Sequence, residues 1–245
     1  MKLSIITITY NSEKTISETL ESVAIQTYKD FEHIIIDGNS SDNTISICNS
    51  FPHVSKIISE PDKGVYDAFN KGLKISTGEI IGFLNSDDIL ASTKVLEKII
   101  GGFNENIDCI FGNVIYVNNQ NDIIRVWNGS KFKKNNFAKG WVSAHPTFYC
   151  RKNIYEKYGF YKTNYKIAAD VELMLRFLEV HKVSSSFISE TLVVMKDGGI
   201  SNNGLISKWI IFKEVIRAHH ENNLKINIFL YALSKVKKLK QFILR

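Results

Sequence analysis

The chain has 245 residues, 44% of them hydrophobic and 23% charged, a composition typical of a globular protein with a substantial core. Its net charge is +6, and residues 235–245 carry five positive charges and no acid, a pattern that suits an anionic lipid surface better than a DNA groove. Three widely spaced cysteines give no disulfide framework or Cys-x-x-Cys metal site, and no apolar run is long enough to predict a transmembrane helix. We expect a cytoplasmic protein without a nucleic-acid partner, either free or peripheral on the cytoplasmic face of the membrane.

Segments typical of strands and of helices alternate through the first ~90 residues. Apolar, β-branched runs predict strands at 3–9, 33–36, 54–59 and 79–84. Helical spacing of apolar residues predicts helices at 13–26, 44–50 and 66–75. Because this alternation favours a parallel sheet with helices on both faces, we predict an α/β fold with a mostly parallel sheet.

The second half of the chain is less regular. Two strands joined by a polar turn are predicted at 109–117 and 123–127, and a third strand at 145–149. Residues 170–180 have the spacing of an amphipathic helix, and the chain is expected to be helical from Ser207 onward.

Three of the predicted strands end in polar clusters. These clusters are Thr9-Tyr10-Asn11, Asp37-Gly38-Asn39-Ser40 and Asn85-Ser86-Asp87-Asp88. In a parallel sheet, ligands bind at the carboxyl ends of the strands. We therefore expect the three clusters to converge on one cleft.

The adjacent carboxylates of Asp87 and Asp88 repel each other unless a positive charge neutralises them. A hard divalent cation such as Mg²⁺ or Mn²⁺ does this and commonly bridges to phosphates. The alternative is that an acid here caps a helix beginning near Ile89. Asp37 leaves a similar choice between contact with a ribose or base and a local Asx-turn.

Residues 60–72 are dense in polar groups and lead into the helix that precedes the Asp87 strand. On that helix Asp67, Asn70 and Lys71 fall within one turn of each other, either as ligand contacts or as a solvated face. The first strand is followed by neither a Walker-type phosphate loop nor a Gly-x-Gly-x-x-Gly turn. ATPases of that type and dinucleotide-binding dehydrogenases are therefore disfavoured.

The chain resembles an inverting family 2 glycosyltransferase with a GT-A fold. The resemblance is carried, in the order of the family, by residues 4–11, 37–44, 62–72 and 78–88. Further matches to a subgroup that builds bacterial surface polysaccharides such as O-antigen or capsule are residues 145–149, 165–172 and 198–201.

The resemblance implies a role for each matching position. It places nucleotide-sugar contacts at Thr9, Asn11, Asp37, Asp62, Lys63, Asp67, Asn70, Asn85 and Ser86. It makes Asp87, with Asp88 beside it, the ligand of Mn²⁺ or Mg²⁺, and Asp170 the catalytic base. Asn85 stands where the family usually has the first acid of an Asp-x-Asp motif, so we expect it to donate a hydrogen bond rather than to bind the metal.

Three further residues are implied on the acceptor side, and each has an alternative. His145 is an acceptor contact, a metal ligand or a histidine satisfied within the core. Gly199 and Ser201 belong to a lid over the donor or to an ordinary turn.

The resemblance also divides the chain: a nucleotide-sugar-binding half at 1–100, an acceptor-binding half at 101–204 and a basic amphipathic helical tail at 205–245. The tail either packs on the domain or keeps the protein near a membrane. The implied activity is transfer of a hexose or N-acetylhexosamine from a UDP-sugar to a saccharide acceptor, which is expected to be lipid-linked. The alternatives are a sugar-nucleotide nucleotidyltransferase and a nucleotide-sugar-binding protein without turnover.

Overall fold

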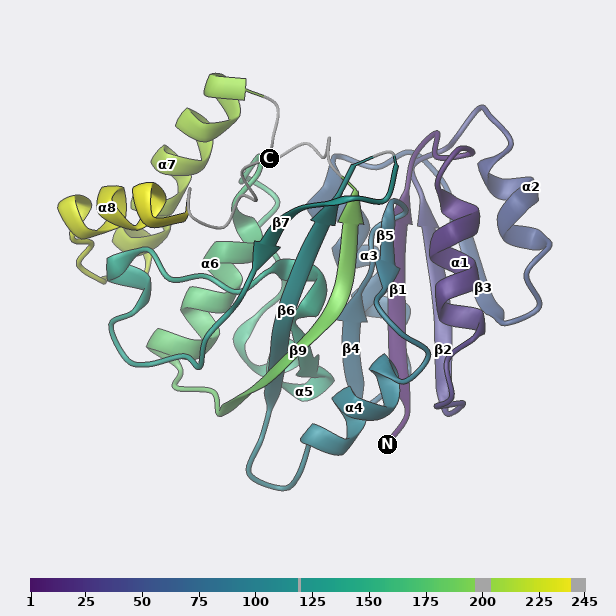
Figure 1. The fold of residues 1–245 in the computed structure, drawn as a ribbon, viewed down its shortest axis with the longest axis horizontal. Coiled ribbons are helices and arrows are strands. Elements are labelled where there is room, and N and C mark those ends of the chain that lie inside the picture. Colours follow the sequence, from purple (N-terminus) through teal and green to yellow (C-terminus); the bar gives the residue numbers. More distant parts are fainter. Residues whose placement is uncertain (119, 197–203, 239–245) are drawn as a thin grey trace.

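The structure, a computed structural model, describes residues 1–118, 120–196 and 204–238. Within these residues one sheet of nine strands runs through the molecule with helices on both faces (Figure 1). The strands are β1 (Leu3–Thr9), β2 (Phe31–Asp37), β3 (Val54–Ser59), β4 (Ile80–Phe83), β5 (Asp88–Leu90), β6 (Cys109–Val117), β7 (Ile123–Trp127), β8 (Tyr149–Arg151) and β9 (Ser185–Lys196). The helices are α1 (Ile16–Ala24), α2 (Thr44–Asn49), α3 (Val65–Ile75), α4 (Val95–Gly102), α5 (Lys152–Tyr158), α6 (Ala169–Leu175), α7 (Gly204–Glu221) and α8 (Ile228–Lys238).

The strand order is β3-β2-β1-β4-β8-β6-β9-β5, and β7 pairs with β6 off this path. Strand β1 is parallel to β2 and β4, β2 is parallel to β3, and β6 is parallel to β9. Strands β5, β7 and β8 pair antiparallel to their neighbours. The prediction of a mostly parallel α/β sheet is confirmed, and β1, β2, β4, β6 and β9 all end at the same edge, the upper edge in Figure 1.

The strand segments are apolar on both faces because helices cover both faces of the sheet. Alternate residues of β1 enter two separate cores: Ile6 packs in the cluster that includes Phe69 of α3, and Ile5 packs in the cluster that includes Leu96 of α4. Helix α3 lies so close to β1 that a Cβ on Gly72 would sit 2.4 Å from a methyl group of Ile6. This contact fixes α3, and the polar loop before it, relative to the strand ends.

Two sequence expectations are wrong. Residues His145–Thr147 form a 3-10 turn, and the strand begins only at Tyr149, because Pro146 has no N–H to donate to a ladder. The helix-cap alternative for the adjacent acids also fails, since Asp88 opens strand β5, which pairs with β9, and the next helix begins at Val95. The predicted helix at 170–180 consists of α6 followed by a π-helical turn, Arg176–Val180.

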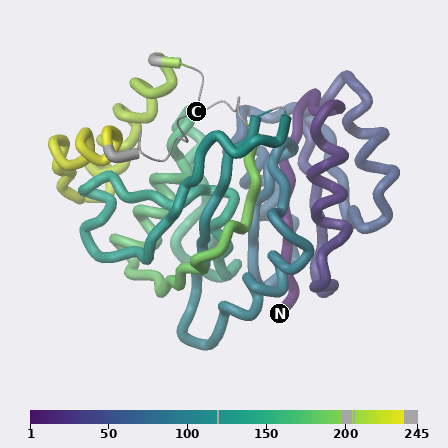
Figure 2. Tube along the Cα trace, in the orientation of Figure 1, coloured from purple at the N-terminus to yellow at the C-terminus, as the bar shows by residue number. Residues whose placement is uncertain are grey.

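The two C-terminal helices pack on the domain at the end opposite α2 (Figure 2). Val215 and Ala218 of α7 and Tyr231 of α8 are 4%, 0% and 4% exposed. Helix α8 begins beside the loop after β7, where the N–H of Asn227 donates to the carbonyl of Ala138 at 3.1 Å. Over the residues described, no helix combines the length and the apolar character needed to cross a bilayer.

Candidate active site

A cavity of about 1150 Å³ opens at the edge of the sheet where the parallel strands end. Its wall comes from the ends of β1, β2 and β9, the segment after β4, the hairpin of β6 and β7, and helices α6, α7 and α8. The predicted site residues that line it are Thr9, Asn11, Asp62, Asn85, Ser86, Asp87, His145 and Asp170. Those that do not line it are Asp37, Lys63, Asp67, Asn70 and Asp88, while Gly199 and Ser201 lie outside the described residues.

Asp37 does not line the cavity and is 0% exposed. Its carboxylate accepts hydrogen bonds from the backbone N–H of Ser40 at 2.9 Å, the hydroxyl of Ser40 at 2.5 Å and the hydroxyl of Ser59 at 2.6 Å. These bonds tie the loop after β2 to the end of β3. A contact between Asp37 and a nucleobase stays a prediction, and Gly38 is the neighbouring residue that faces the cavity.

Asp62 reaches over Gly38 from the loop before α3. A Cβ on Gly38 would lie 2.8 Å from one carboxylate oxygen of Asp62, so the absence of a side chain at 38 permits this approach. The other oxygen of Asp62 accepts the N–H of Gly64 at 2.7 Å. Asp62 is therefore held at the cavity wall next to the end of β2.

The polar residues of α3 hold this loop in place. Asp67 accepts the N–H of Lys63 at 3.0 Å, and Lys71 pairs with Glu60 at 2.9 Å and donates to the carbonyl of Pro61 at 2.8 Å. Asn70 faces the other way. Its amide exchanges two hydrogen bonds with the backbone of Tyr161, at 2.8 and 3.0 Å, and so joins α3 to the segment between α5 and α6.

The two adjacent acids have different environments. Asp87 lines the cavity, whereas Asp88 is 1% exposed and accepts a hydrogen bond from the Asn85 amide at 2.9 Å. Burial raises the pKa of Asp88 well above its ordinary value, and the charge of Asp87 raises it further. Burial also raises the pKa of Asp87, opposed by its own backbone N–H and by the charge of Lys196. Asp87 is thus the acid of this pair that can meet a ligand.

The residues around Asp87 fit a divalent cation that is held partly by the protein and partly by a bound substrate. Within the described ranges, no three or more His, Cys, Asp or Glu side chains are grouped to hold a metal ion. Mg²⁺ and its relatives are nevertheless often held by one or two carboxylates together with substrate phosphates and water. The cavity-facing carboxylate of Asp87 fits that mode, in which the ion would bind together with a diphosphate.

Asp170 also lines the cavity, from the first turn of α6. Its Oδ1 atom is buried and has no hydrogen-bond partner. Burial raises the pKa of Asp170 to about 6, the N–H groups of Val171 and of Asp170 itself oppose the rise, and the charge of Glu214 adds to it. A carboxyl with a pKa near 6 is ionised at pH 7 and still basic enough to accept a proton.

His145 lines the cavity but is also satisfied within the fold. Its Nε2 lies 2.9 Å from the Tyr161 hydroxyl, and its ring stacks on Phe69 with centroids 4.9 Å apart. Burial lowers the pKa of His145 to about 4, so the ring is neutral at pH 7.

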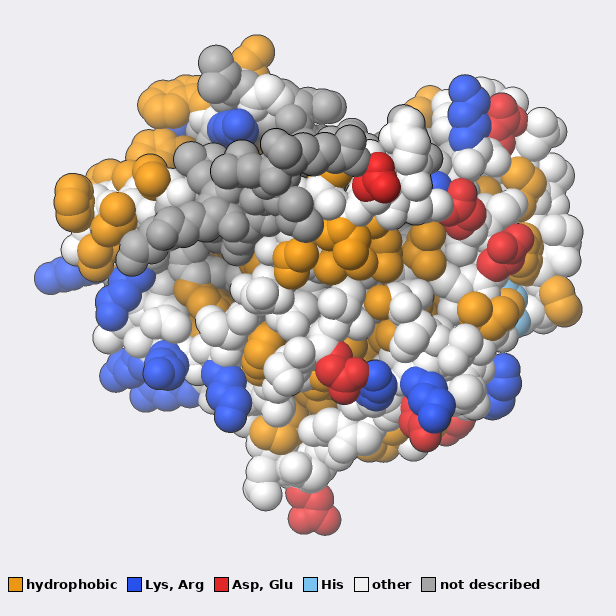
Figure 3. Space-filling view, viewed as in Figure 1, with side chains coloured by type: hydrophobic (Ala, Val, Ile, Leu, Met, Phe, Trp, Pro, Cys, Tyr) orange, Lys and Arg blue, Asp and Glu red, His pale blue; other side chains and the backbone are white. Residues whose placement is uncertain are grey.

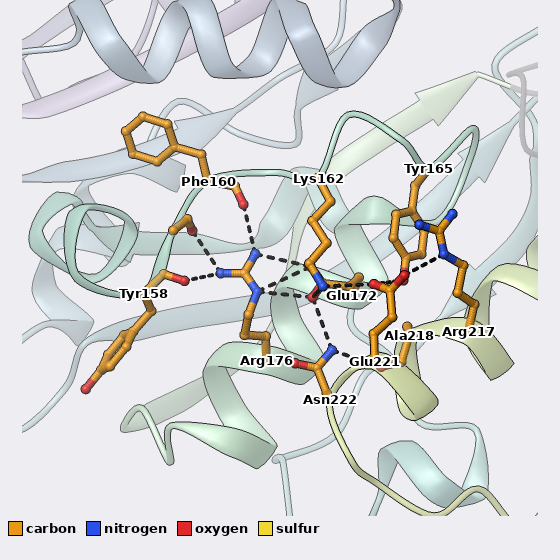
Figure 4. Close-up of polar contacts among 11 residues, drawn as sticks. Tyr158, Phe160, Lys162, Tyr165, Glu172, Arg176, Arg217, Ala218, Glu221 and Asn222 are labelled. Atoms are coloured by element: carbon orange, nitrogen blue, oxygen red, sulfur yellow. Dashed lines mark hydrogen bonds and ion pairs between the residues drawn. The ribbon is translucent and has the colours of Figure 1, made fainter.

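Helix α7 holds the segment before α6, a contact that no sequence motif predicted. Glu214 of α7 accepts three backbone N–H groups from residues 166–168, directly before α6. Two turns further along, Glu221 accepts from Lys162 at 2.9 Å, and Lys162 also pairs with the fully buried Glu172 at 2.9 Å (Figure 4). Neither acid matches a motif, because each contacts a segment about 50 residues away in the chain.

Comparisons with known proteins identify the family and the fold. The family model described as "Glycosyl transferase family 2" matches residues 4–159. A "PGL/p-HBAD biosynthesis glycosyltransferase" of Mycobacterium bovis is 30% identical over 212 residues, which cover 81% of this chain and 78% of the relative. A "UDP-Glc:alpha-D-GlcNAc-diphosphoundecaprenol beta-1,3-glucosyltransferase" of Escherichia coli is 38% identical over 119 residues, 48% of this chain and 47% of the relative.

Solved structures share the fold. Residues 1–349 of S. aureus TarS, crystallised in complex with UDP-GlcNAc, superpose with a TM-score of 0.70 and 21% identity over 91% of this chain and 66% of that one. A mannosyltransferase from Pyrobaculum calidifontis, in complex with GDP-Man and Mn²⁺, gives a TM-score of 0.64 and 17% identity over 88% of this chain and 64% of that one.

Proposed function

The chain belongs to glycosyltransferase family 2 and has a GT-A fold, and from that premise we propose that it transfers a hexose or N-acetylhexosamine from a UDP-sugar to a lipid-linked saccharide, with inversion at the anomeric carbon. The proposal rests on the observation that one cavity is lined both by Asp87 and by Asp170, whose Oδ1 has no hydrogen-bond partner. The first suits a metal-bound diphosphate and the second suits a general base. Family membership sets aside the nucleotidyltransferase alternative.

The donor is proposed to lie along the ends of β1 and β2 and the segment after β4. Thr9, Asn11 and Asp62 line this part of the cavity and offer polar groups to a ribose or a base. Tyr10 is 64% exposed on the same wall, so its ring can stack on a base without displacing core residues. The E. coli relative is named for UDP-glucose and TarS was crystallised with UDP-GlcNAc, which supports UDP as the nucleotide.

Asp87 is proposed to hold Mn²⁺ or Mg²⁺ together with the diphosphate, with Asn85 and Ser86 near the sugar. The hydroxyl of Ser86 lies 2.9 Å from that of Ser12, which connects this segment to the end of β1. A bound ion would neutralise the charge that develops on the departing diphosphate. The Mn²⁺ complex of the P. calidifontis neighbour supports a metal of this class.

Asp170 is proposed to act as the base. As the acceptor oxygen bonds to the anomeric carbon, its proton passes to Asp170, and the bond from that carbon to the diphosphate oxygen breaks. The attack comes from the face opposite the leaving UDP, so the configuration inverts. The first turn of a helix favours the ionised carboxylate that this step needs.

The acceptor is proposed to be presented at a membrane surface, as part of bacterial cell-surface polysaccharide synthesis. Large apolar side chains that are exposed gather on α7 and α8, at the left of Figure 3. They are Ile206, Trp209, Ile228, Phe229, Leu233 and Val236. Exposed lysines accompany them, and the same helices contribute Val215 and Tyr231 to the cavity wall. An apolar stripe with lysines suits the interface of an anionic bilayer.

Vesicle sedimentation tests the membrane proposal. Phosphatidylglycerol vesicles should retain the protein at low salt, and the double variant Trp209→Ser, Phe229→Ser should bind at least about tenfold more weakly. Ile25→Ser, an equally exposed change far from α7, is the matched control. A membrane-facing surface would be contradicted if all three proteins bound the vesicles equally. It would also be contradicted if the double substitution abolished self-association of the protein and left vesicle binding unchanged.

A panel of nucleotide sugars tests the proposed function itself. We expect UDP-sugars to raise the melting temperature in the presence of Mn²⁺ more than in its absence, and one of them to support transfer with inversion in the product NMR spectrum. If UDP-sugars raise the melting temperature equally with and without Mn²⁺, the proposed role of the metal is wrong. Retention at the anomeric carbon would remove Asp170 as the base of a single displacement.

A further inference from the structure

The carboxylate of Glu214 accepts hydrogen bonds from three consecutive backbone amides. It accepts the N–H groups of Lys166 at 2.6 Å, Ile167 at 2.9 Å and Ala168 at 2.9 Å, and the residue is only 8% exposed. Hydrogen bonds to an ionised acceptor are shorter and stronger than those between neutral groups. Glu214 therefore fixes the path of residues 166–168 more firmly than water would.

This short segment is also held from the other side. The Tyr66 hydroxyl of α3 donates to the carbonyl of Ile167 at 2.5 Å. Helix α6 begins immediately afterwards, at Ala169, and Asp170 is its second residue. The location of Asp170 thus depends on contacts from α3 on one side and from α7 on the other.

Glu214 also occupies the N–H groups of residues 166–168, which would otherwise be free to bond the carboxylate of Asp170. If it were absent, the amides of 166–168 would need another acceptor, because buried N–H groups are costly to leave unpaired. The nearest carboxylate along the chain is Asp170, whose Oδ1 has no partner. A turn of Asp170 toward those amides would take its free oxygen away from the cavity.

We propose that Glu214 is a positioning residue for sugar transfer, which holds the 166–168 amides so that the free oxygen of Asp170 faces the acceptor. This inference rests on the proposed role of Asp170 as base. It assigns α7, outside the span that matches the family model, a part in the reaction.

The effect of Glu214 can be separated from general stability through pH. Burial is the main cause of the raised pKa of Asp170, about 6, and the charge of Glu214 raises it further. The charge of Asp170 also acts on Tyr66 and Tyr161, and burial raises the pKa of both hydroxyls, so they stay neutral. His219 lies further along α7 on the cavity wall, with its Nδ1 bonded to the carbonyl of Val215 at 2.8 Å. Because the charge of Glu214 raises the pKa of Asp170, removing that charge should lower the pKa of Asp170.

The test compares Glu214→Gln with Glu221→Gln in the full chain. Both variants remove one carboxylate of α7, but Glu221 bonds Lys162, Tyr165 and Arg217 and not the 166–168 amides. For Glu214→Gln we expect kcat to fall roughly tenfold to a hundredfold, an unchanged KM for the donor, and an acid limb of the kcat profile displaced to lower pH. Glu221→Gln should keep the wild-type limb and kcat within about threefold.

Two kinetic results would overturn the proposal. One is wild-type kcat and an unmoved acid limb in Glu214→Gln and Glu214→Ala. The other is an equal loss of kcat in both glutamine variants that parallels the fall in their melting temperatures. That result would mean that the substitutions act only by loosening the packing of α7.

Hydrogen exchange separates this proposal from the proposed function. The amides of 166–168 should be protected in the wild type and exchange much faster in Glu214→Ala, whatever the reaction is. If wild-type protein shows that protection but no sugar transfer, the proposed function fails while the contact stands. If the amides exchange equally fast in both proteins, the positioning role fails even where transfer is observed.

Discussion

On the proposed donor side of the cavity, Thr9, Asn11 and Asp87 stand at or just after the ends of neighbouring parallel strands, all within the first 90 residues. On the proposed acceptor side, Asp170 lies in the first turn of helix α6, and the segment before that helix is held by Tyr66 of α3 and Glu214 of α7. The donor side is therefore built by the sheet, and its side chains follow the register of the strands. The acceptor side is built by side-chain contacts between segments far apart in the chain, so single substitutions can disturb it without touching the sheet.

The two sides should separate most clearly when the base is removed. We expect Asp170→Asn to reduce kcat about 10²- to 10⁴-fold, the usual size of a general-base contribution, because the amide cannot take the proton. UDP affinity, measured by calorimetry with Mn²⁺, should stay within about twofold because the donor side is intact. A parallel loss of UDP affinity would show that the two sides are not independent.

The same substitution should stabilise the fold at neutral pH. Because the folded-state pKa of Asp170 is raised from 3.8 to about 6, ionisation disfavours the folded state above pH 6, by up to roughly 3 kcal/mol. Asp170→Asn removes that cost, so its gain in unfolding free energy should be full at pH 8, smaller at pH 5 and absent below pH 4. Urea unfolding at these three values checks the trend, and a gain that does not depend on pH would contradict the raised pKa.

Within the donor side, Asp87 and Asp88 should behave differently. Asp87→Asn should weaken Mn²⁺-dependent UDP binding about 10- to 100-fold, since even outer contacts of a metal site have effects of that size. Asp88→Asn is the matched change: it keeps the buried hydrogen bond to Asn85 possible and should leave the metal dependence in place. If calorimetric titrations show an equal loss of Mn²⁺-dependent UDP affinity in both variants, both carboxylates hold the metal, and not Asp87 alone.

The smallest expected effect concerns the joint between the two sides. Asn70→Ala removes two hydrogen bonds to the backbone of Tyr161 and should lower the unfolding free energy by about 1–3 kcal/mol, with UDP affinity unchanged. The exposed Asn106→Ala is the control and should be neutral in the same urea titration. A neutral Asn70→Ala with weakened UDP binding would instead favour direct donor contact.

Much of the donor side could be predicted because strand ends are local features of a sequence. The apolar runs of β1, β2 and β4 and the polar residues after them place Thr9 and Asn85 at one edge without any knowledge of long-range contacts. The difference between Asp87 and Asp88 could not be predicted, because it depends on β5 pairing with β9, more than 100 residues later. The pairing turns Asp88 into the core and leaves Asp87 at the cavity.

The acceptor side was harder to predict for the same reason. The helix at 170–180 and its leading acid follow from local spacing, but the partners of that helix lie on α7. Glu214 sits in a stretch of apolar and basic residues, where a single acid carries no pattern. The strand expected at His145–Tyr149 was wrong because Pro146 redirects the chain into a 3-10 turn, a local signal that the apolar residues around it outweighed.

A crystal structure of the protein with an unreactive UDP-sugar analogue and Mn²⁺ tests the account most directly. We expect the anomalous signal of Mn²⁺ between Asp87 and the diphosphate, and the anomeric carbon about 6 Å from the free oxygen of Asp170, with room for one acceptor hydroxyl between them. The diphosphate should leave the sugar on the face away from Asp170. A metal bound elsewhere, or a sugar whose open face points away from Asp170, would contradict the division of the cavity into a donor side and an acceptor side.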